Sequence, residues 1–186
     1  MSYQATATAP SSSKAQAQAR ERADLLSALA SARHFVRYPA RGLSDDQARQ
    51  RTTVSELTLG GLIKHVTAVE RHWTSFIVHG PSVAPDFSNP TEADRETWAD
   101  GFRLLPGETL ADALAAYEDT ARHTGELVAT LPDLDADHPL PPAPWWTPGE
   151  RWSARRVLLH IAAETAQHAG HADIIRESLD GAKSMA

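Results

Sequence analysis

Residues 153–181 read SARRVLLHIAAETAQHAGHADIIRESLDG. At about 100° per residue, six of them fall on one face of a predicted helix: Val157, Ile161, Glu164, His168, His171 and Ile175. The apolar members mark the face that points to the core, so we expect the carboxylate and the two imidazoles to point there as well. A buried carboxylate is costly unless another group pairs with it. A divalent metal ion is the simplest partner that an acid and neighbouring imidazoles can share.

A second predicted helix, over residues 58–79, also carries a histidine inside an apolar stripe. That stripe consists of Leu62, His65, Val69, His72 and Phe76. Taken alone, His65 is better explained as a hydrogen-bonded core histidine. Glu164 and His168, however, are four residues apart and can reach one ion together. The sequence therefore predicts a three-ligand site of His65, Glu164 and His168, typical of catalytic zinc; the alternative is a hydrogen-bonded His–Glu network without an ion.

Three more histidines belong near this predicted site. His171 has three interpretations: a fourth ligand, a residue that orients one of the ligands, or a general base. We expect His160 to support the ligands from outside the site or to belong to the core. His72 is expected near the rim of the site, also outside the ligand set.

Two further helices are predicted by apolar residues at alternating spacings of four and three. One runs over residues 20–37 and the other over residues 109–131. Ser44 and Gln47 match a capping box for a short helix, although an ordinary connector explains them better. Alternation predicts no strand. Four helices with two long connections therefore predict an all-α four-helix bundle.

The boundaries of the domain follow from composition. Residues 1–18 are mainly Ala, Ser, Thr and Gln with little to bury, and we expect a disordered tail there. The bundle is expected over residues 19–181, followed by a C-terminal tail at 182–186. A long connection over residues 81–107 is expected to form a lid or a surface-packed loop. A proline-rich connection follows the third helix over residues 132–152.

Tryptophans in these two connections are candidates for the substrate pocket. Trp98 lies in the first connection, and Trp145 and Trp146 lie in the second. Their rings can close over a substrate, or they can cover the end of the bundle as hydrophobic plugs. The sequence does not decide between these two interpretations.

Composition and charge exclude several classes of function. The chain has 186 residues, enough for one domain with a sizeable core. Its 18 Lys and Arg residues against 24 Asp and Glu residues give a net charge of −6, which argues against nucleic acid or an anionic membrane as the main partner. The chain has no cysteine, so it cannot supply a protein thiol. With no signal core or spanning segment, a cytoplasmic location is expected.

Two helical motifs resemble those of a known family. Leu59-Gly-Gly-Leu-Ile-Lys-His65-Val, with Val69-Glu-Arg-His-Trp73 after it, resembles the second-helix signature of DinB-like proteins. Trp152-Ser-Ala-Arg-Arg-Val-Leu-Leu-His160, with Glu164-Thr-Ala-Gln-His168-Ala-Gly-His171-Ala-Asp after it, resembles their last helix. Within these metalloproteins, the chain is most similar to the actinobacterial mycothiol S-transferases. The resemblance extends from about Leu25 to Gly181.

This resemblance implies an up-down-down-up bundle that binds a divalent metal, zinc or nickel. The family's ligand positions correspond to His65, Glu164 and His168. Many members have histidine at the position of Glu164, and a glutamate there resembles the mycothiol-dependent maleylpyruvate isomerase. His171 stands where many relatives carry glutamine, which leaves a fourth ligand open.

We expect metal-assisted thiol chemistry. A bound divalent ion would hold a low-molecular-weight thiol, mycothiol by resemblance, and lower its pKa, so that the thiolate attacks an electrophilic small molecule. His171 or His72 can take the proton. The alternatives are a metal-dependent hydrolase, a thiol-dependent isomerase and a non-enzymatic metal-binding stress or accessory protein. A homodimer is compatible with the sequence.

Overall fold

The computed structural model describes residues 10–83 and 90–185, and its elements are mainly helices. The α-helices are α1 (Pro10–Arg37), α2 (Asp45–Arg49), α3 (Leu59–His79), α4 (Glu92–Gly101), α5 (Leu110–Thr130) and α6 (Ala154–Asp180). The remaining elements are the 3₁₀ helices η1 (Tyr38–Ala40) and η2 (Gly80–Val83) and the strands β1 (Asp137–Pro139) and β2 (Arg151–Ser153). The prediction of a mainly helical chain is confirmed. No helix in the described ranges is long and apolar enough to cross a membrane.

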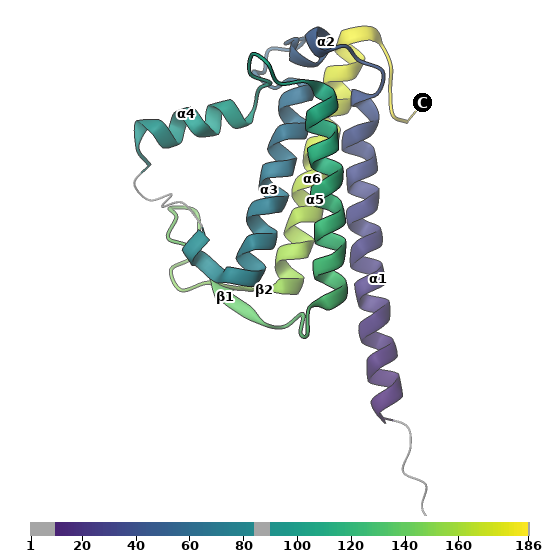
Figure 1. Cartoon of the computed structure of the whole chain (residues 1–186), viewed down its shortest axis with the longest axis vertical. Helices are drawn as coiled ribbons and strands as arrows, with labels where there is room; N and C mark the ends of the chain where they lie inside the picture. Colours follow the sequence, from purple (N-terminus) through teal and green to yellow (C-terminus); the bar gives the residue numbers. More distant parts are fainter. Residues whose placement is uncertain (1–9, 84–89, 186) are drawn as a thin grey trace, which may run out of the picture.

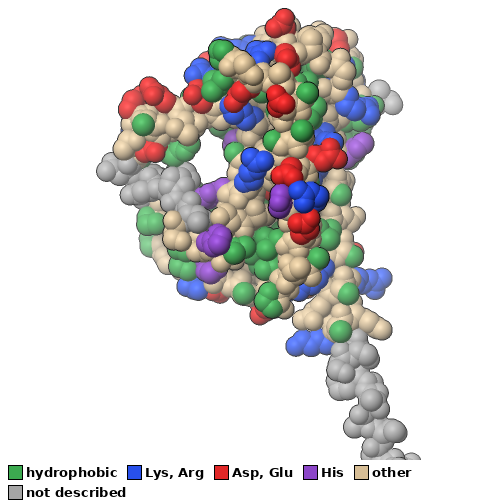
Figure 2. Space-filling view, in the orientation of Figure 1, with side chains coloured by type: hydrophobic (Ala, Val, Ile, Leu, Met, Phe, Trp, Pro, Cys, Tyr) green, Lys and Arg blue, Asp and Glu red, His purple; other side chains and the backbone are tan. Residues whose placement is uncertain are grey.

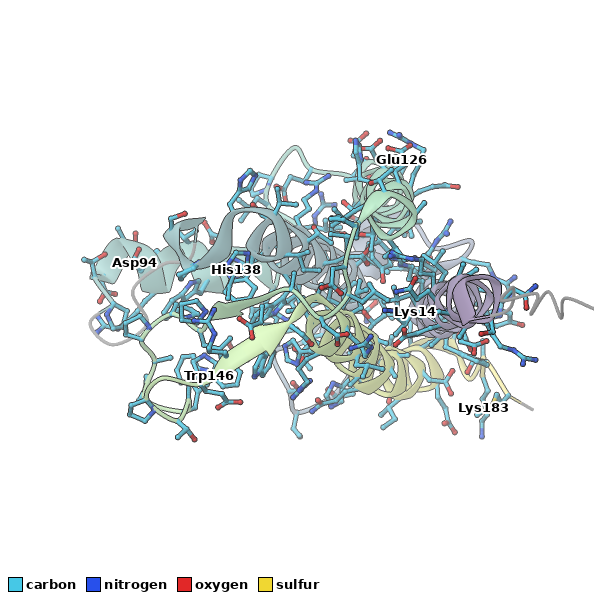
Figure 3. All side chains as sticks on the ribbon, turned by 90° about the horizontal axis from the view of Figure 1, so that it is seen from below. Lys14, Asp94, Glu126, His138, Trp146 and Lys183 are labelled. Atoms are coloured by element: carbon cyan, nitrogen blue, oxygen red, sulfur yellow. The ribbon has the colours of Figure 1, made fainter. Side chains whose placement is uncertain are left out.

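Four long helices, α1, α3, α5 and α6, lie side by side (Figure 1). α1 packs chiefly against α6, and α5 packs chiefly against α3, which also contacts α6. In Figure 1, α1 and α6 run in one direction along the molecule, and α3 and α5 run in the opposite direction. The lateral helix α4 extends away from this group. Seen from below, Asp94 of α4 and Trp146 of the β1–β2 loop lie on the same side, away from Lys14 of α1 (Figure 3).

Local sequence signals account for the ends of the helices. Ser44 and Thr91 form complete capping boxes at the starts of α2 and α4. The short helix predicted as the less favoured interpretation of Ser44 and Gln47 is therefore present. Ser153 caps α6 by accepting a hydrogen bond from the backbone N–H of Arg156. Gly181 ends α6 at φ 80°, a left-handed conformation that favours glycine.

The first helix is longer than the sequence analysis predicted. α1 begins at Pro10, so residues 10–18, expected in a disordered tail, are helical. Residues 13–20 are exposed, and no buried face could indicate a helix there. Their alanine, glutamine and lysine side chains favour a helix without any burial, and proline suits the first helical position. Residues 1–9 of the expected tail lie outside the described residues.

Both long connections contain regular structure that was not predicted. The lid or surface loop expected over 81–107 contains α4, of which no residue is buried, so no apolar stripe announced it. The second connection contains an antiparallel pair, β1 and β2, which corrects the expectation that the chain has no strand. Each strand has three residues, too few for alternation to be recognised. Residues 84–89 of the first connection lie outside the described residues.

The core consists of two hydrophobic clusters with a polar layer between them. The first cluster includes Val36, Leu62, Val66, Tyr117 and Ile175. The second cluster includes Leu29, Trp73, Phe76, Val128 and Val157. Each long helix places a buried polar residue between the two clusters: Arg33, Glu70, Thr124 and Thr165. The four helices thus meet at one polar level along their length.

A buried ion pair lies at the centre of this polar layer. Glu70 is completely buried, and Arg33 is nearly so. The Arg33 Nε donates a hydrogen bond to the Glu70 Oε2 at 3.1 Å, and its Nη2 donates to Oε1. The Thr124 hydroxyl also donates to Oε1. The carboxylate of α3 is therefore satisfied jointly by α1 and α5, as a buried charge must be.

We expect Glu70→Gln to lower the free energy of unfolding by about 3–5 kcal/mol, because it leaves the Arg33 charge buried without a counter-charge. Urea denaturation followed by circular dichroism measures this. The matched control is Glu118→Gln, since the Glu118 side chain is 72% exposed and its ion pair is with the partly exposed Arg37; its effect should stay within about 0.5 kcal/mol. Equal effects of the two substitutions would contradict the role given to the buried pair.

Candidate metal centre

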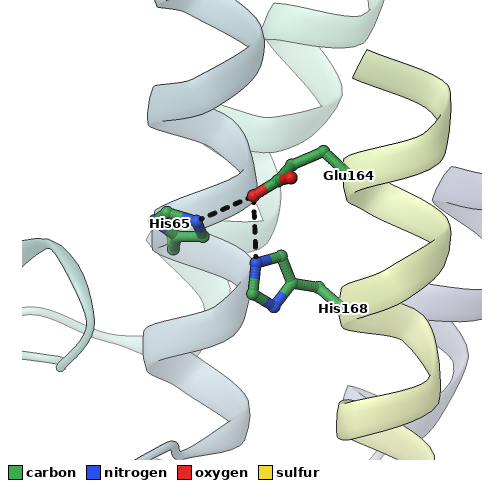
Figure 4. Close-up of side chains that lie close together, drawn as sticks. All are labelled: His65, Glu164 and His168. Atoms are coloured by element: carbon green, nitrogen blue, oxygen red, sulfur yellow. Dashed lines mark ion pairs between the residues drawn. The ribbon is translucent and has the colours of Figure 1, made fainter. Parts of the chain in front are cut away.

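Three potential metal ligands converge from two helices (Figure 4). α3 supplies His65, and α6 supplies Glu164 and His168, which are one helical turn apart. The Glu164 Oε1 lies 3.3 Å from the His168 Nε2 and 3.7 Å from the His65 Nε2. One ligand atom from each residue lies within 4.8 Å of the other two. The structure therefore brings together the three residues that the sequence analysis selected, at a distance that one small ion can bridge.

These residues lie at the edge of the core and not inside it, which corrects the expected inward direction. The exposed fractions of the side chains are 17% for His65, 27% for Glu164 and 12% for His168. The buried positions beside them on α6 are Thr165 and Ala169. Figure 2 shows an opening between α4 and the helical body, with histidine side chains (purple) at its edge. A small molecule can thus approach the cluster from solvent.

Electrostatics keep the carboxylate of the cluster ionised. The nearby imidazole of His168, and next that of His65, hold the pKa of Glu164 far below its usual range, against the opposing effect of burial. A deprotonated carboxylate beside two imidazole nitrogens is a donor set that binds divalent metals of the zinc type.

His171 contacts the far side of one of these imidazoles. Its Nδ1 lies 3.3 Å from the Nδ1 of His168, whose Nε2 faces Glu164. His168 therefore has one nitrogen directed at the carboxylate and the other at His171. This arrangement is the one by which a neighbouring polar group sets the tautomer and orientation of a histidine ligand.

His160 and His72 lie next to aromatic rings. The His160 ring is 4.9 Å from that of Trp73 and 5.0 Å from that of Trp152, and the His72 ring is 5.5 Å from that of Trp73. Burial lowers the pKa of both histidines; for His160, the nearby Glu164 carboxylate partly opposes this shift. Both imidazoles are thus mainly neutral at pH 7.

The three tryptophans expected at the substrate pocket are placed differently from one another. Trp146 is half-buried, and its ring lies 4.9 Å from Trp152 and 6.4 Å from Trp73. Trp145 is 58% exposed and lies 6.3 Å from Trp146. Trp98 is half-buried on α4. Trp73 and Trp152 were not among the predicted site residues, and their stacked rings, 5.0 Å apart, lie at the centre of this aromatic cluster.

A comparison with protein families assigns the chain. A family model described as Mycothiol-S-transferase matches residues 24–181, from within α1 to the end of α6. The chain belongs to the mycothiol-S-transferase family. This confirms the resemblance found in the two helical motifs and identifies the chain as a transferase. A search among curated proteins finds no match.

Phe102 lies beside the candidate ligands of this mycothiol-S-transferase family member, and it was not predicted from the sequence. The Phe102 ring stacks on the His65 imidazole with centroids 4.0 Å apart and planes 20° apart. The contact depends on close approach of the chain after α4 to the start of α3, because a Cβ on Gly61 would lie 1.8 Å from the Phe102 carbonyl oxygen. The Gly60-Gly61 pair was the available signal, since paired glycines in a helix often mark a close backbone approach.

We expect Gly61→Ala to displace Phe102 and to destabilise the fold by about 1–3 kcal/mol through overpacking. The matched control is Gly170→Ala on α6, where a Cβ meets no atom within 4 Å, so that its higher helix propensity should stabilise the protein by up to about 1 kcal/mol. Urea denaturation measures both. In NMR spectra, the His65 ring resonances should lose the ring-current shift caused by Phe102 in Gly61→Ala but not in Gly170→Ala. Unchanged His65 resonances in Gly61→Ala would show that the stacking of Phe102 on His65 does not require a glycine at position 61.

Proposed function

We propose that His65, Glu164 and His168 hold one divalent cation. Two atoms bound to tetrahedral zinc at about 2.0–2.2 Å lie about 3.4 Å apart, close to the 3.3 Å and 3.7 Å separations around the Glu164 Oε1. Two imidazoles and a carboxylate suit zinc best, and nickel accepts the same donors. Three ligands leave room for an exogenous one, as in catalytic sites.

We propose that the protein is a metal-dependent thiol transferase that joins a low-molecular-weight thiol, mycothiol, to an electrophilic small molecule. The observation that carries this proposal is the partly exposed His65–Glu164–His168 cluster in a member of a mycothiol-S-transferase family. The absence of cysteine supports it, because the sulfur must then arrive with a substrate. When bound, the cation supplies a Lewis acid that lowers the pKa of a thiol.

The side chains around the cluster have separate proposed roles. His171 orients His168 through the contact between their Nδ1 atoms. His72, neutral at pH 7 and two turns beyond His65 on α3, accepts the proton of the thiol. His160 fixes the aromatic rings on the turn before Glu164.

The tryptophans on the open side are proposed to border the electrophile. Trp98 on α4 and Trp145 and Trp146 in the β1–β2 loop come from the two elements that extend to the same side of the helices (Figures 1 and 3). Apolar aromatic rings beside a few polar groups are typical of small-molecule sites. The four long helices are proposed to form the up-down-down-up bundle of DinB-like proteins, with 19–181 as the domain.

Purified protein should contain about one divalent metal ion per chain, and His65→Ala and His168→Ala should each lose most of it, because each removes one of three ligands. Plasma mass spectrometry measures the content. The control is His123→Ala, whose exposed ring lies on α5 beside Asp119. Chelation should lower the melting temperature, since metal at 100 times its Kd stabilises by about 2.7 kcal/mol. Full metal content in both ligand variants would reject the site.

Turnover by metal-loaded protein should require added thiol, with mycothiol the best substrate of a thiol panel. Glu164→Gln should keep the fold, bind metal more weakly and slow turnover, since the amide is a poorer ligand than the carboxylate. Mass spectrometry of products with and without thiol, over a panel of electrophiles, makes the measurement. Equal turnover without thiol would favour a hydrolase. Rearranged substrate without net thiol addition would favour an isomerase, and metal binding without any turnover would favour an accessory protein.

A further inference from the structure

A second hollow lies between α1 and α5, apart from the metal centre. It has a volume of about 610 Å³, and none of the three proposed metal ligands lines it. Its charged lining consists of Arg33, Arg37, Arg41, Arg122 and Glu118. Figure 2 shows this face, where basic, acidic and histidine side chains meet beside the upper part of α1. Four positive charges against one negative charge line the groove, in a chain whose net charge is −6.

Two of these arginines are already neutralised by carboxylates. Arg33 is paired with the buried Glu70. Arg122 is paired with Asp119 and Glu126 on the surface of α5. These two guanidinium groups therefore add little net charge to the groove.

The other two arginines lack a comparable counter-charge. The Arg37 Nη2 lies 3.6 Å from the Glu118 Oε2, but the Glu118 side chain is 72% exposed, so solvent screens this pair. Within the described ranges, Arg41 forms no ion pair, and its guanidinium lies 3.4 Å above the centroid of the Tyr38 ring. With Glu118 counted against Arg37, the described part of the groove keeps about one positive charge that no carboxylate neutralises, that of Arg41.

Packing of the helix end does not account for this concentration. Arg33 and Arg37 are four residues apart in α1, and Arg41 follows η1 in an extended conformation, so three like charges gather near the end of α1. The dipole at a helix C-terminus favours a cation, but it is equivalent to only about −0.5 charge. One arginine would be enough to satisfy it.

We propose that the groove binds a small soluble ligand that carries a phosphate group and an apolar portion. Planar guanidinium forks match the oxygen geometry of phosphate better than an ammonium does. The rest of the lining offers an apolar floor from Ala30, Leu114 and Ala121, and the volume lies in the range of small-molecule sites. This site is independent of the metal centre and of the proposed transfer reaction.

Isothermal titration calorimetry of the full chain with phenyl phosphate, at fixed ionic strength, tests the proposal. Wild-type protein should bind phenyl phosphate with a Kd of about 1 mM or lower and more tightly than inorganic phosphate, because the phenyl group reaches the apolar floor. The double substitution Arg37→Gln with Arg41→Gln should weaken binding at least about tenfold. Arg95→Gln is the matched control: this exposed arginine of α4 pairs with Glu92 outside the groove, and its loss should leave Kd unchanged.

If the double variant does not fold by circular dichroism, Arg37→Lys with Arg41→Lys replaces it. This pair keeps both charges but removes the planar forks, and it should weaken binding by a smaller factor, of about threefold to fivefold. Absence of binding up to about 10 mM phenyl phosphate, or equal Kd values for wild-type and variant protein, would overturn the proposal. Binding to phosphatidic acid vesicles without binding of phenyl phosphate would overturn the assignment to a soluble ligand.

Discussion

The charge of Glu70 constrains the whole helical assembly. A carboxylate with no access to water is tolerated only where donors meet it, and here they come from Arg33 on α1 and Thr124 on α5. An axial shift of any of these helices by one turn, about 5.4 Å, would separate the groups and leave a charge unpaired. α6 places Thr165 at the same level. The polar layer therefore fixes the register of helices that hydrophobic contacts alone hold only loosely along their axes.

That register determines whether the candidate ligands can meet. His65 precedes Glu70 on α3, so the α3 side of the cluster is tied to the buried ion pair, and on α6 Glu164 directly precedes the buried Thr165. The separations of 3.3 Å and 3.7 Å around the Glu164 Oε1 are shorter than one helical turn. A core of apolar residues alone could tolerate small axial slips. The buried ion pair opposes such slips between α1 and α3, and the Thr124 hydroxyl extends this to α5, at the expense of burying two charges.

The sequence predicted the features that depend on residues close together in the chain better than those that depend on contacts between distant residues. Helical periodicity and caps identified the four long helices, and the spacing of Glu164 and His168 predicted their convergence with His65; whether they bind metal stays a prediction. Periodicity gave the direction of these side chains only approximately, so they were expected inside the core and lie at its edge. α4 has no buried face to detect. The contact of Phe102 with His65 joins residues from different parts of the chain, and the Gly60-Gly61 pair signals a close approach there without indicating which segment makes it.

The division of the core into two clusters has a consequence for divergence within the family. The apolar residues nearest the ligands, such as Val66 and Ala169, belong to one cluster, and the aromatic group around Trp73 and Trp152 belongs to the other. Substitutions that share no packing partner have nearly additive effects on stability. Substitutions in one cluster should therefore change stability nearly independently of substitutions in the other. The aromatic cluster can then change its packing without repacking the apolar residues beside the candidate ligands.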